Sequence, residues 1–161
     1  MLRRMPEGDE SNTNGNGSAR RRYRLLLADD HPDVLREARD LLSREFDIVG
    51  AVNDGAALLE LAAKTRPDVI VADIYMPRMT GFDACLGILQ GGFCDSVVLL
   101  SMHSNPDLVE EAMSGGMRGF VLKEDAGEEL CEAVATAAAG GVYLSAGARR
   151  ALNDARRRRR K

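Results

Sequence analysis

Five short runs of apolar residues constrain the fold of this 161-residue chain more than any other feature. Each run is rich in leucine and β-branched residues and lacks the polar alternation of a strand with one wet face. Each therefore predicts a parallel strand that is buried on both faces. The runs are YRLLLAD (23–29), DIVGAV (47–52), PDVIVAD (67–73), DSVVLLS (95–101) and RGFVLK (118–123).

Helical patterns separate these runs. The first follows Pro32, which stands at a position that favours a first helical turn. Its apolar residues recur on one side, at Val34, Ala38, Leu41 and Leu42. Four more helices are expected from residue 54, after residue 81, from residue 105 and over 128–139. The alternation predicts an α/β fold, a doubly wound five-stranded parallel sheet (order 2-1-3-4-5) with five helices and right-handed crossovers.

Composition and charge divide the chain into three parts. Residues 5–19 are almost free of apolar side chains, so 1–22 is expected to be a disordered leader. Residues 23–145 form the predicted domain, with 9 Lys+Arg against 21 Asp+Glu. Residues 146–161 are expected to be a short helix with a basic tail, with 8 basic residues and 1 acidic residue. The acidic body is poorly suited to gripping nucleic acid.

The sequence also bears on where the protein works. Segments of ~20 apolar residues, as a membrane span requires, are absent from it. The basic residues near the start are followed by a polar stretch and not by the apolar region of a secretory signal. A cytoplasmic protein is expected.

Polar side chains close the predicted strands at the edge where a sheet of this order binds its ligands. The first strand ends in Asp29 and Asp30, the third in Asp73, the fourth in Ser101 and the fifth in Lys123. Three carboxylates and one ammonium leave a net charge of −2, which a divalent cation would neutralise. Hard oxygen ligands with room for water suit Mg²⁺, so we expect a Mg²⁺ cofactor here.

Four segments together resemble the receiver domain of a two-component response regulator of the NarL/FixJ (LuxR-type) subfamily, over residues 23–145. They are ADDHPDVLREARDLL, PDVIVADIYMPRMTGFD, VVLLSMH and SGGMRGFVLKEDAGEELCEAVATAAAGGVYLS. The resemblance implies a flavodoxin-like receiver fold. It also implies a signalling protein that is not an enzyme and that accepts a phosphoryl group from a sensor histidine kinase or a phosphotransfer protein.

The resemblance assigns roles to the residues at the strand ends. Asp73 is the expected phosphoacceptor, and Lys123 stabilises the charge on the transferring phosphoryl oxygens. Asp30 is expected to bind Mg²⁺ directly, together with Asp73, while Asp29 acts beside it, largely through water. The backbone carbonyl of Tyr75 is a further expected metal ligand.

Other residues near the site have expected roles in switching or gating. Ser101 would hydrogen-bond the phosphoryl group, and Phe120 would turn inward as the aromatic switch; the alternative for Phe120 is a plain core aromatic. Tyr75 and His103 would flank the mouth and gate water, although a solvated loop residue is the favoured interpretation of His103. His31 is interpreted as a polar residue at a helix entry and not as a metal ligand.

The sequence does not determine which downstream function the domain controls. Members of the subfamily usually continue into a helix-turn-helix domain that binds DNA, and the residues after Ser145 are too few for one. A stand-alone receiver and a truncated one are both consistent with this. In the tail, Leu144, Ala148, Ala151 or Leu152, and Ala155 align on one side. The run of arginines is interpreted either as a solvated helix end or linker, or as an arm for nucleic acid or an acidic partner.

Three classes of function compete. The leading hypothesis is a phosphorylation-driven switch, with a homodimer on phosphorylation as a further expected partner. The alternative is the regulatory part of a DNA-binding transcription regulator. Enzymes are disfavoured: a phosphohydrolase of the haloacid-dehalogenase type requires an acid where Tyr75 stands. An FMN carrier of the same fold requires a phosphate-binding loop after the first strand, which is missing.

Overall fold

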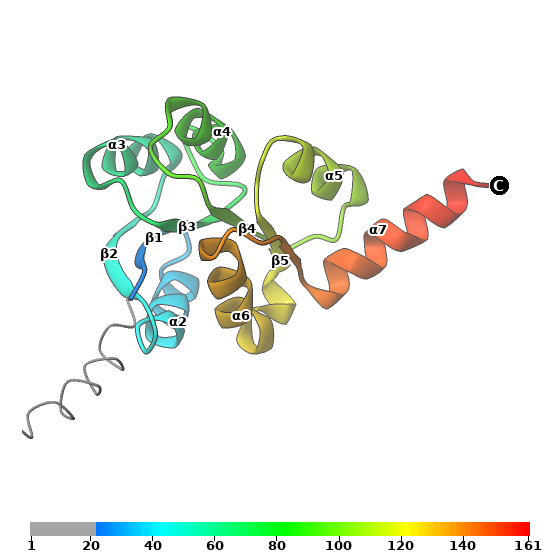
Figure 1. The fold of residues 1–161 in the computed structure, drawn as a ribbon, viewed down its shortest axis with the longest axis horizontal. Coiled ribbons are helices and arrows are strands. Elements are labelled where there is room, and N and C mark those ends of the chain that lie inside the picture. Colours follow the sequence, from blue (N-terminus) through cyan, green and yellow to red (C-terminus); the bar gives the residue numbers. More distant parts are fainter. Residues whose placement is uncertain (1–21) are drawn as a thin grey trace, which may run out of the picture.

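The computed structural model describes residues 22–161, and these form a six-stranded parallel sheet in the order β2-β1-β3-β4-β5-β6 (Figure 1). The predicted order of the first five strands is confirmed, and a sixth short strand is added at the edge beside β5. The strands are β1 (Arg24–Ala28), β2 (Asp47–Val52), β3 (Val69–Asp73), β4 (Val97–Ser101), β5 (Gly119–Leu122) and β6 (Tyr143–Leu144).

Helices cover both faces of the sheet, with α3, α4 and α5 on one face and α2 and α6 on the other (Figure 1). The five expected helices are confirmed, and the expected C-terminal helix is present as α7. A short 3₁₀ helix, η1, joins β5 to α6. The bounds are α2 (Pro32–Leu42), α3 (Gly55–Thr65), α4 (Gly81–Gly91), α5 (Pro106–Ser114), η1 (Lys123–Asp125), α6 (Ala126–Ala138) and α7 (Ala146–Arg159).

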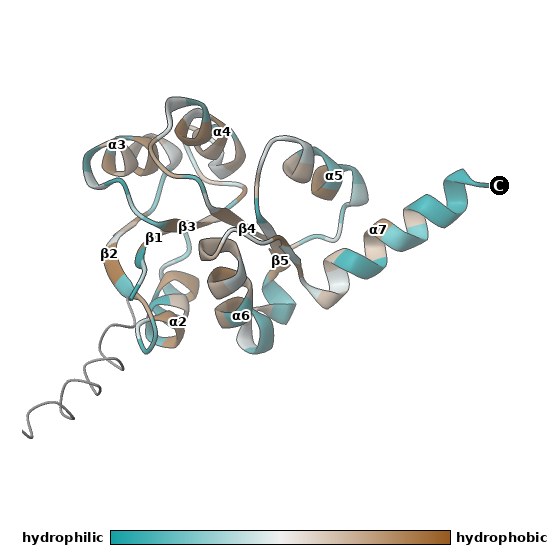
Figure 2. Cartoon of the chain, in the orientation of Figure 1, coloured by the Kyte–Doolittle hydropathy of each residue, from teal (hydrophilic) through white to brown (hydrophobic). Residues whose placement is uncertain are grey.

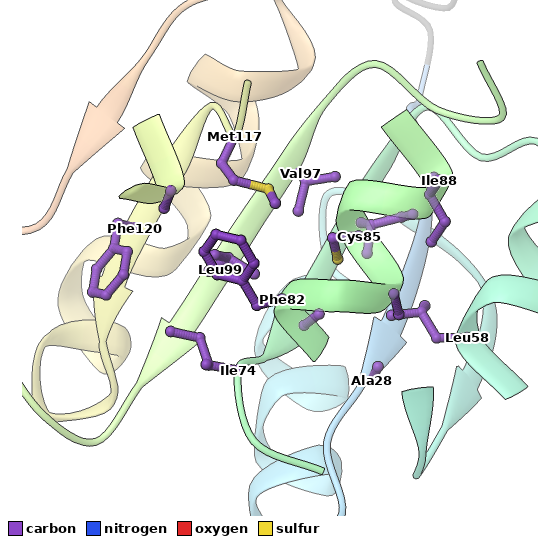
Figure 3. Close-up of a cluster of buried hydrophobic side chains, with 14 of the residues drawn as sticks. Ala28, Leu58, Ile74, Phe82, Cys85, Ile88, Val97, Leu99, Met117 and Phe120 are labelled. Carbon is purple, nitrogen blue, oxygen red and sulfur yellow. The ribbon is translucent and has the colours of Figure 1, made fainter. Parts of the chain in front are cut away.

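The core consists of two layers that the strand pleat separates. Side chains of a strand alternate between faces, so Leu25 and Leu27 pack under α2 and α6 while Leu26 packs on the opposite side. All of β3, β4 and β5 is buried, as the unalternating runs predict. Figure 2 shows the apolar character of the central strands. Figure 3 shows Phe120 of β5 beside Leu99, its register partner on β4, within the layer that α3, α4, α5 and α7 cover.

Helix α7 is docked against the domain. Its aligned apolar side chains Ala148, Leu152 and Ala155 are buried, and Ala148 and Leu152 belong to the same core layer as Phe120. At its first turn the backbone N–H of Gly147 donates to Asp125 Oδ2 at 3.0 Å. A Cβ on Gly147 would lie 2.4 Å from Leu122 Cδ1, so α7 approaches β5 closely at this residue and a larger side chain would require Leu122 to shift.

Most of the predicted leader lies outside the described residues, which begin at Arg22. The Arg22 guanidinium contacts the β2 side of the sheet, pairing with Asp47 at 3.0 Å and donating to the carbonyl of Ser43 at 2.8 Å. Among residues 22–161 every helix is too short or too polar to cross a membrane.

Candidate functional site

Parallel pairing brings the acidic strand ends together at one edge of the sheet. Ala28 of β1 is in register with Ala72 of β3, so Asp29 and Asp73 follow on neighbouring strands. Leu100 of β4 pairs with Asp73, and therefore Ser101 lies one position further along the same edge. The topology thus brings the ends of β1, β3 and β4 to one place, at the switch point between β1 and β3.

The backbone beneath Asp73 is held in place by the start of α4. The N–H of Gly81 donates to the carbonyl of Ile74 at 2.7 Å. A Cβ at Gly81 would lie 1.8 Å from the carbonyl oxygen of Asp73, so only glycine permits this approach. Thr80 caps the helix by accepting from the N–H of Asp83 at 3.0 Å. These contacts fix the segment that carries Asp73.

The carboxylates form a tight cluster with one buried lysine. One oxygen from each of Asp29, Asp30 and Asp73 and the Nδ1 of His31 all lie within 4.8 Å of one another. The ammonium of Lys123 lies 3.0 Å from Asp29 Oδ2 and 3.3 Å from Asp73 Oδ2. Asp29 and Asp73 are both buried. Of the expected site residues, the structure therefore brings together the three acids and Lys123.

Two carboxylate oxygens in this cluster are left unsatisfied. Lys123 is at ion-pair distance from Asp29 Oδ2, and His31 Nδ1 is 3.2 Å from Asp30 Oδ1. Yet neither oxygen accepts a hydrogen bond of good geometry from the described residues, and both atoms are buried. Buried anionic oxygens that accept no hydrogen bond are costly, and three convergent carboxylates suit a hard divalent cation, with the ring of His31 beside them. The donor set therefore fits the cation that the sequence predicts.

The environment perturbs the acid–base behaviour of Asp73. Burial raises the pKa of its carboxyl above the ordinary aspartate value, and the negative charge of Asp29 raises it further. Lys123 opposes both effects, and so does the backbone N–H of Tyr75. A cation bound beside Asp73 would oppose them in the same direction, by favouring the ionised carboxylate.

His31 belongs to this site, which the sequence analysis did not anticipate. As expected, it precedes α2 as the N-cap residue, and its side chain makes no capping hydrogen bond. Its backbone N–H instead donates to Asp29 Oδ1 at 2.9 Å, and its Nδ1 lies 3.1 Å from the same oxygen. Its position directly after two site acids was the available signal, because a helix that starts there turns its first side chain back toward the strand ends.

The side chains of the remaining predicted residues lie around the cluster without bonding to it. The Ser101 hydroxyl donates to the carbonyl of His103 at 2.9 Å and accepts from the His103 N–H at 3.1 Å, which closes a small loop after β4. Phe120 is fully buried, as a core aromatic would be. The side chain of Tyr75 is 58% exposed, at the rim of the site.

Comparison with known proteins identifies the kind of domain. Residues 25–135 match the model of the response regulator receiver domain. The probable transcriptional regulatory protein NarL of Mycobacterium tuberculosis is 37% identical over 122 residues, which are 74% of this chain and 56% of that protein. The chain spans about half to three-fifths of the length of the curated relatives that it matches.

Solved structures agree with this match. A LuxR-family two-component response regulator from Aurantimonas sp. SI85-9A1 superposes with a TM-score of 0.79 at 27% identity, covering 84% of this chain and 99% of that one. The isolated REC domain of RcsB from Salmonella enterica serovar Typhimurium, determined with the phosphomimetic BeF₃⁻, gives 0.75 at 27% identity, covering 82% and 99%. The chain belongs to the response regulator receiver domain family.

Proposed function

We propose that this chain is a phosphoryl-accepting switch of a two-component pathway, with Asp73 as the acceptor. The observation that carries the proposal is a buried Asp73 carboxylate that touches Lys123 beside two unsatisfied acidic oxygens. In the transfer, a carboxylate oxygen of Asp73 bonds to phosphorus while the bond from phosphorus to the kinase histidine nitrogen breaks. An ionised carboxylate needs no general base for this attack.

The other site residues hold charge and position. Mg²⁺ would be held directly by Asp30 and Asp73 and by the backbone carbonyl of Tyr75, and through water by Asp29. The ion would supply positive charge to the phosphoryl oxygens. Lys123 already contacts Asp73 and would supply a second positive charge to the phosphoryl oxygens. Such preorganised charge is most of what phosphoryl transfer requires from a protein.

The switch follows from the hydroxyl of Ser101. Its present partners are the backbone groups of His103, so a new hydrogen bond to a phosphoryl group on Asp73 would open this loop and draw it toward the site. Phe120 lies on the adjoining strand and is already buried; its part is to repack as the loop moves. A phenylalanine has no hydroxyl, so packing alone sets its preference.

The expected partners follow from this role. The phosphoryl donor is a sensor histidine kinase or a phosphotransfer protein in the cytoplasm, and phosphorylation favours a homodimer. In this role the chain acts as a signalling switch and not as an enzyme. A second function, the regulatory part of a DNA-binding transcription regulator, is supported by the names and the greater length of its relatives.

The proposal is tested by phosphorylation with acetyl phosphate and Mg²⁺, read out by intact mass. The wild-type chain should gain one phosphoryl group, and chelation of Mg²⁺ should prevent this. Asp73→Asn should gain none, while Asp83→Asn, an exposed aspartate in the first turn of α4, should behave as wild type. Equal incorporation by Asp73→Asn and wild type would refute the assignment.

The exposed ring of Tyr75 supports a further role at the rim, in controlling the water that hydrolyses the acyl phosphate. Tyr75→Ser should change the half-life of the phosphorylated chain at least roughly twofold, because it uncovers the site. Tyr75→Phe keeps the ring and should preserve the half-life. An unchanged half-life in the serine variant would remove this role.

A further inference from the structure

The outward face of α7 carries a dense set of cations. Its apolar side chains are buried against the domain, which leaves the arginines exposed. Figure 1 shows the C-terminal half of α7 extending beyond the rest of the fold, and Figure 2 shows that this half is strongly hydrophilic. The exposed cations are Arg149, Arg150, Arg156, Arg157, Arg158, Arg159, Arg160 and Lys161.

Only some of these cations are paired. Arg159 bonds to Glu110 at 3.1 Å and lies 3.3 Å from Asp107, and Arg157 lies 3.3 Å from Asp154. Arg156 lies 4.0 Å from Glu110. Within residues 22–161, the other cations of this face form no ion pair: Arg149, Arg150, Arg158, Arg160 and Lys161.

The unpaired cations are spread along a rigid element. At ~1.5 Å per residue, Arg149 and Arg160 are about 16 Å apart along the helix axis. The pairing of Arg159 with α5 and the burial of Leu152 hold α7 to the domain, so the arrangement is fixed before any partner binds. A helix whose backbone is already ordered loses less entropy on binding a regular row of anions than a flexible tail would, since only the arginine side chains become ordered.

The chemistry of this face selects among anionic partners. A basic helix binds a membrane surface most firmly when apolar side chains also insert, and those of α7 are buried. Single-stranded nucleic acid is bound by stacking on aromatic rings, and α7 contains none. Protein interfaces rely on buried aromatic or aliphatic anchors, which the exposed face also lacks. Duplex phosphates require only cations, and guanidinium groups bind them bidentately.

We propose that the outward face of α7 is a sequence-independent binding surface for the phosphate backbone of a nucleic acid duplex. The acidic body, with 9 Lys+Arg against 21 Asp+Glu over 23–145, repels the same backbone and restricts contact to the projecting helix. Binding of this kind needs neither Asp73 nor a cation in the acidic site. Its failure would therefore leave the proposed phosphoryl switch untouched.

The test is fluorescence anisotropy of the full chain with two labelled DNA duplexes of about 20 base pairs and unrelated sequence. With about four phosphate contacts, affinity should fall roughly 100-fold between 50 and 200 mM salt. The two sequences should bind equally well, because phosphate contacts carry no sequence information. A strong preference for one duplex, or binding that salt does not weaken, would contradict the proposal.

A pair of charge-matched variants locates the surface. Arg158→Gln/Arg160→Gln removes two unpaired cations from α7, while Arg36→Gln/Arg39→Gln removes two exposed arginines from α2. The α7 variant should weaken binding roughly tenfold or more at 50 mM salt and lower the salt slope by about 2. The α2 variant should bind as wild type. Glutamine preserves helix propensity, and unchanged unfolding midpoints would verify that both variants fold.

Two further outcomes would overturn the proposal. Equal DNA binding by the two double variants would show that net charge alone matters and not the α7 face. Binding to poly-glutamate or to vesicles of anionic lipid, as tight as to the duplex, would show that the face has no preference for the phosphate backbone.

Discussion

Two regions of the molecule differ in how their charges are paired. The acidic site at the carboxyl ends of the strands concentrates like charges, whereas the contact between α5 and α7 pairs opposite ones. In the site, Asp29, Asp30 and Asp73 crowd together, and two of their oxygens have no hydrogen-bond partner among the described residues. At the contact, the carboxylate of Glu110 accepts two hydrogen bonds from the guanidinium of Arg159, with acid and base from different helices.

The same contrast holds for the groups that surround these charges. Around α7, Glu129 accepts from the hydroxyl of Tyr143 and the N–H of Ala146, and Ser145 accepts from the N–H of Leu122. In the site, Lys123 is the only lysine or arginine that pairs with the clustered acids among residues 22–161. Satisfied polar groups stabilise a fold, whereas concentrated like charges oppose it. The α7 contact is therefore structural, and the acidic site is kept at a cost in stability.

The largest effect that would test this contrast is the loss of a buried side chain from α7. Leu152→Ala should lower the free energy of unfolding by about 3 kcal/mol, because it opens a cavity against the layer that contains Phe120. Urea denaturation measures the change. Val142→Ala, at a residue that is 60% exposed, is the control and should change stability by less than about 0.5 kcal/mol. Equal effects would mean that α7 does not dock in solution.

An intermediate effect is expected from Mg²⁺. At 100 times its dissociation constant, the cation should raise the free energy of unfolding by about 2.7 kcal/mol, because it binds the folded acidic site. Asp30→Ala should remove more of this gain than Asp29→Ala. The reason is that both oxygens of Asp29 already face a cation or a donor: Oδ1 accepts from the N–H of His31, and Oδ2 lies 3.0 Å from the ammonium of Lys123. Asp30 makes no ion pair with Lys123 among the described residues.

Thermal unfolding with and without Mg²⁺ measures this gain. Asp33→Ala, a highly exposed acid in the first turn of α2, is the control and should keep the full gain. The reverse order, with Asp29→Ala losing more than Asp30→Ala, would reassign the direct ligand.

The smallest effect concerns the pH dependence of the α5–α7 contact. The hydrogen bond from Arg159 lowers the pKa of Glu110 below its ordinary value. A lowered pKa in the folded state adds stability above the ordinary pKa, and this stability is lost as the pH falls through the lowered value. Glu110→Gln should therefore be slightly less stable than wild type at pH 7 and indistinguishable from it once the carboxyl is protonated. A difference that persists in acid would exclude the ion pair as its cause.

Most of the fold could be predicted from the sequence because its signals are local. Runs of leucine and β-branched residues, without alternating polar residues, predicted five strands. Pro32 and the Asn105-Pro106 pair predicted helix starts, which the structure confirms at α2 and α5. Strand β6 was missed because it has only two residues, and its pairing with Gly119 and Phe120 depends on a distant strand. The η1 turn was missed because Lys123–Asp125 is too short to show a period.

The grouping of the acidic residues in the site could be predicted from the sequence, but the hydrogen bonds of the residues around them could not. Strand ends placed Asp29, Asp73 and Lys123 together, because parallel order fixes which ends are neighbours. The bonding of Ser101 to its own loop could not be predicted, since it depends on a turn two residues long. Arg159 and Glu110 are 49 residues apart, and no local pattern links them.

The central claim, that the acidic site is kept for function against stability, is tested most directly at Asp73. Its pKa is raised by burial and by Asp29, so wild type loses stability as the pH rises from the ordinary aspartate value through the raised one. We predict that in EDTA at pH 7 Asp73→Asn has a higher free energy of unfolding than wild type in urea denaturation. A lower free energy of unfolding for Asp73→Asn would contradict the claim.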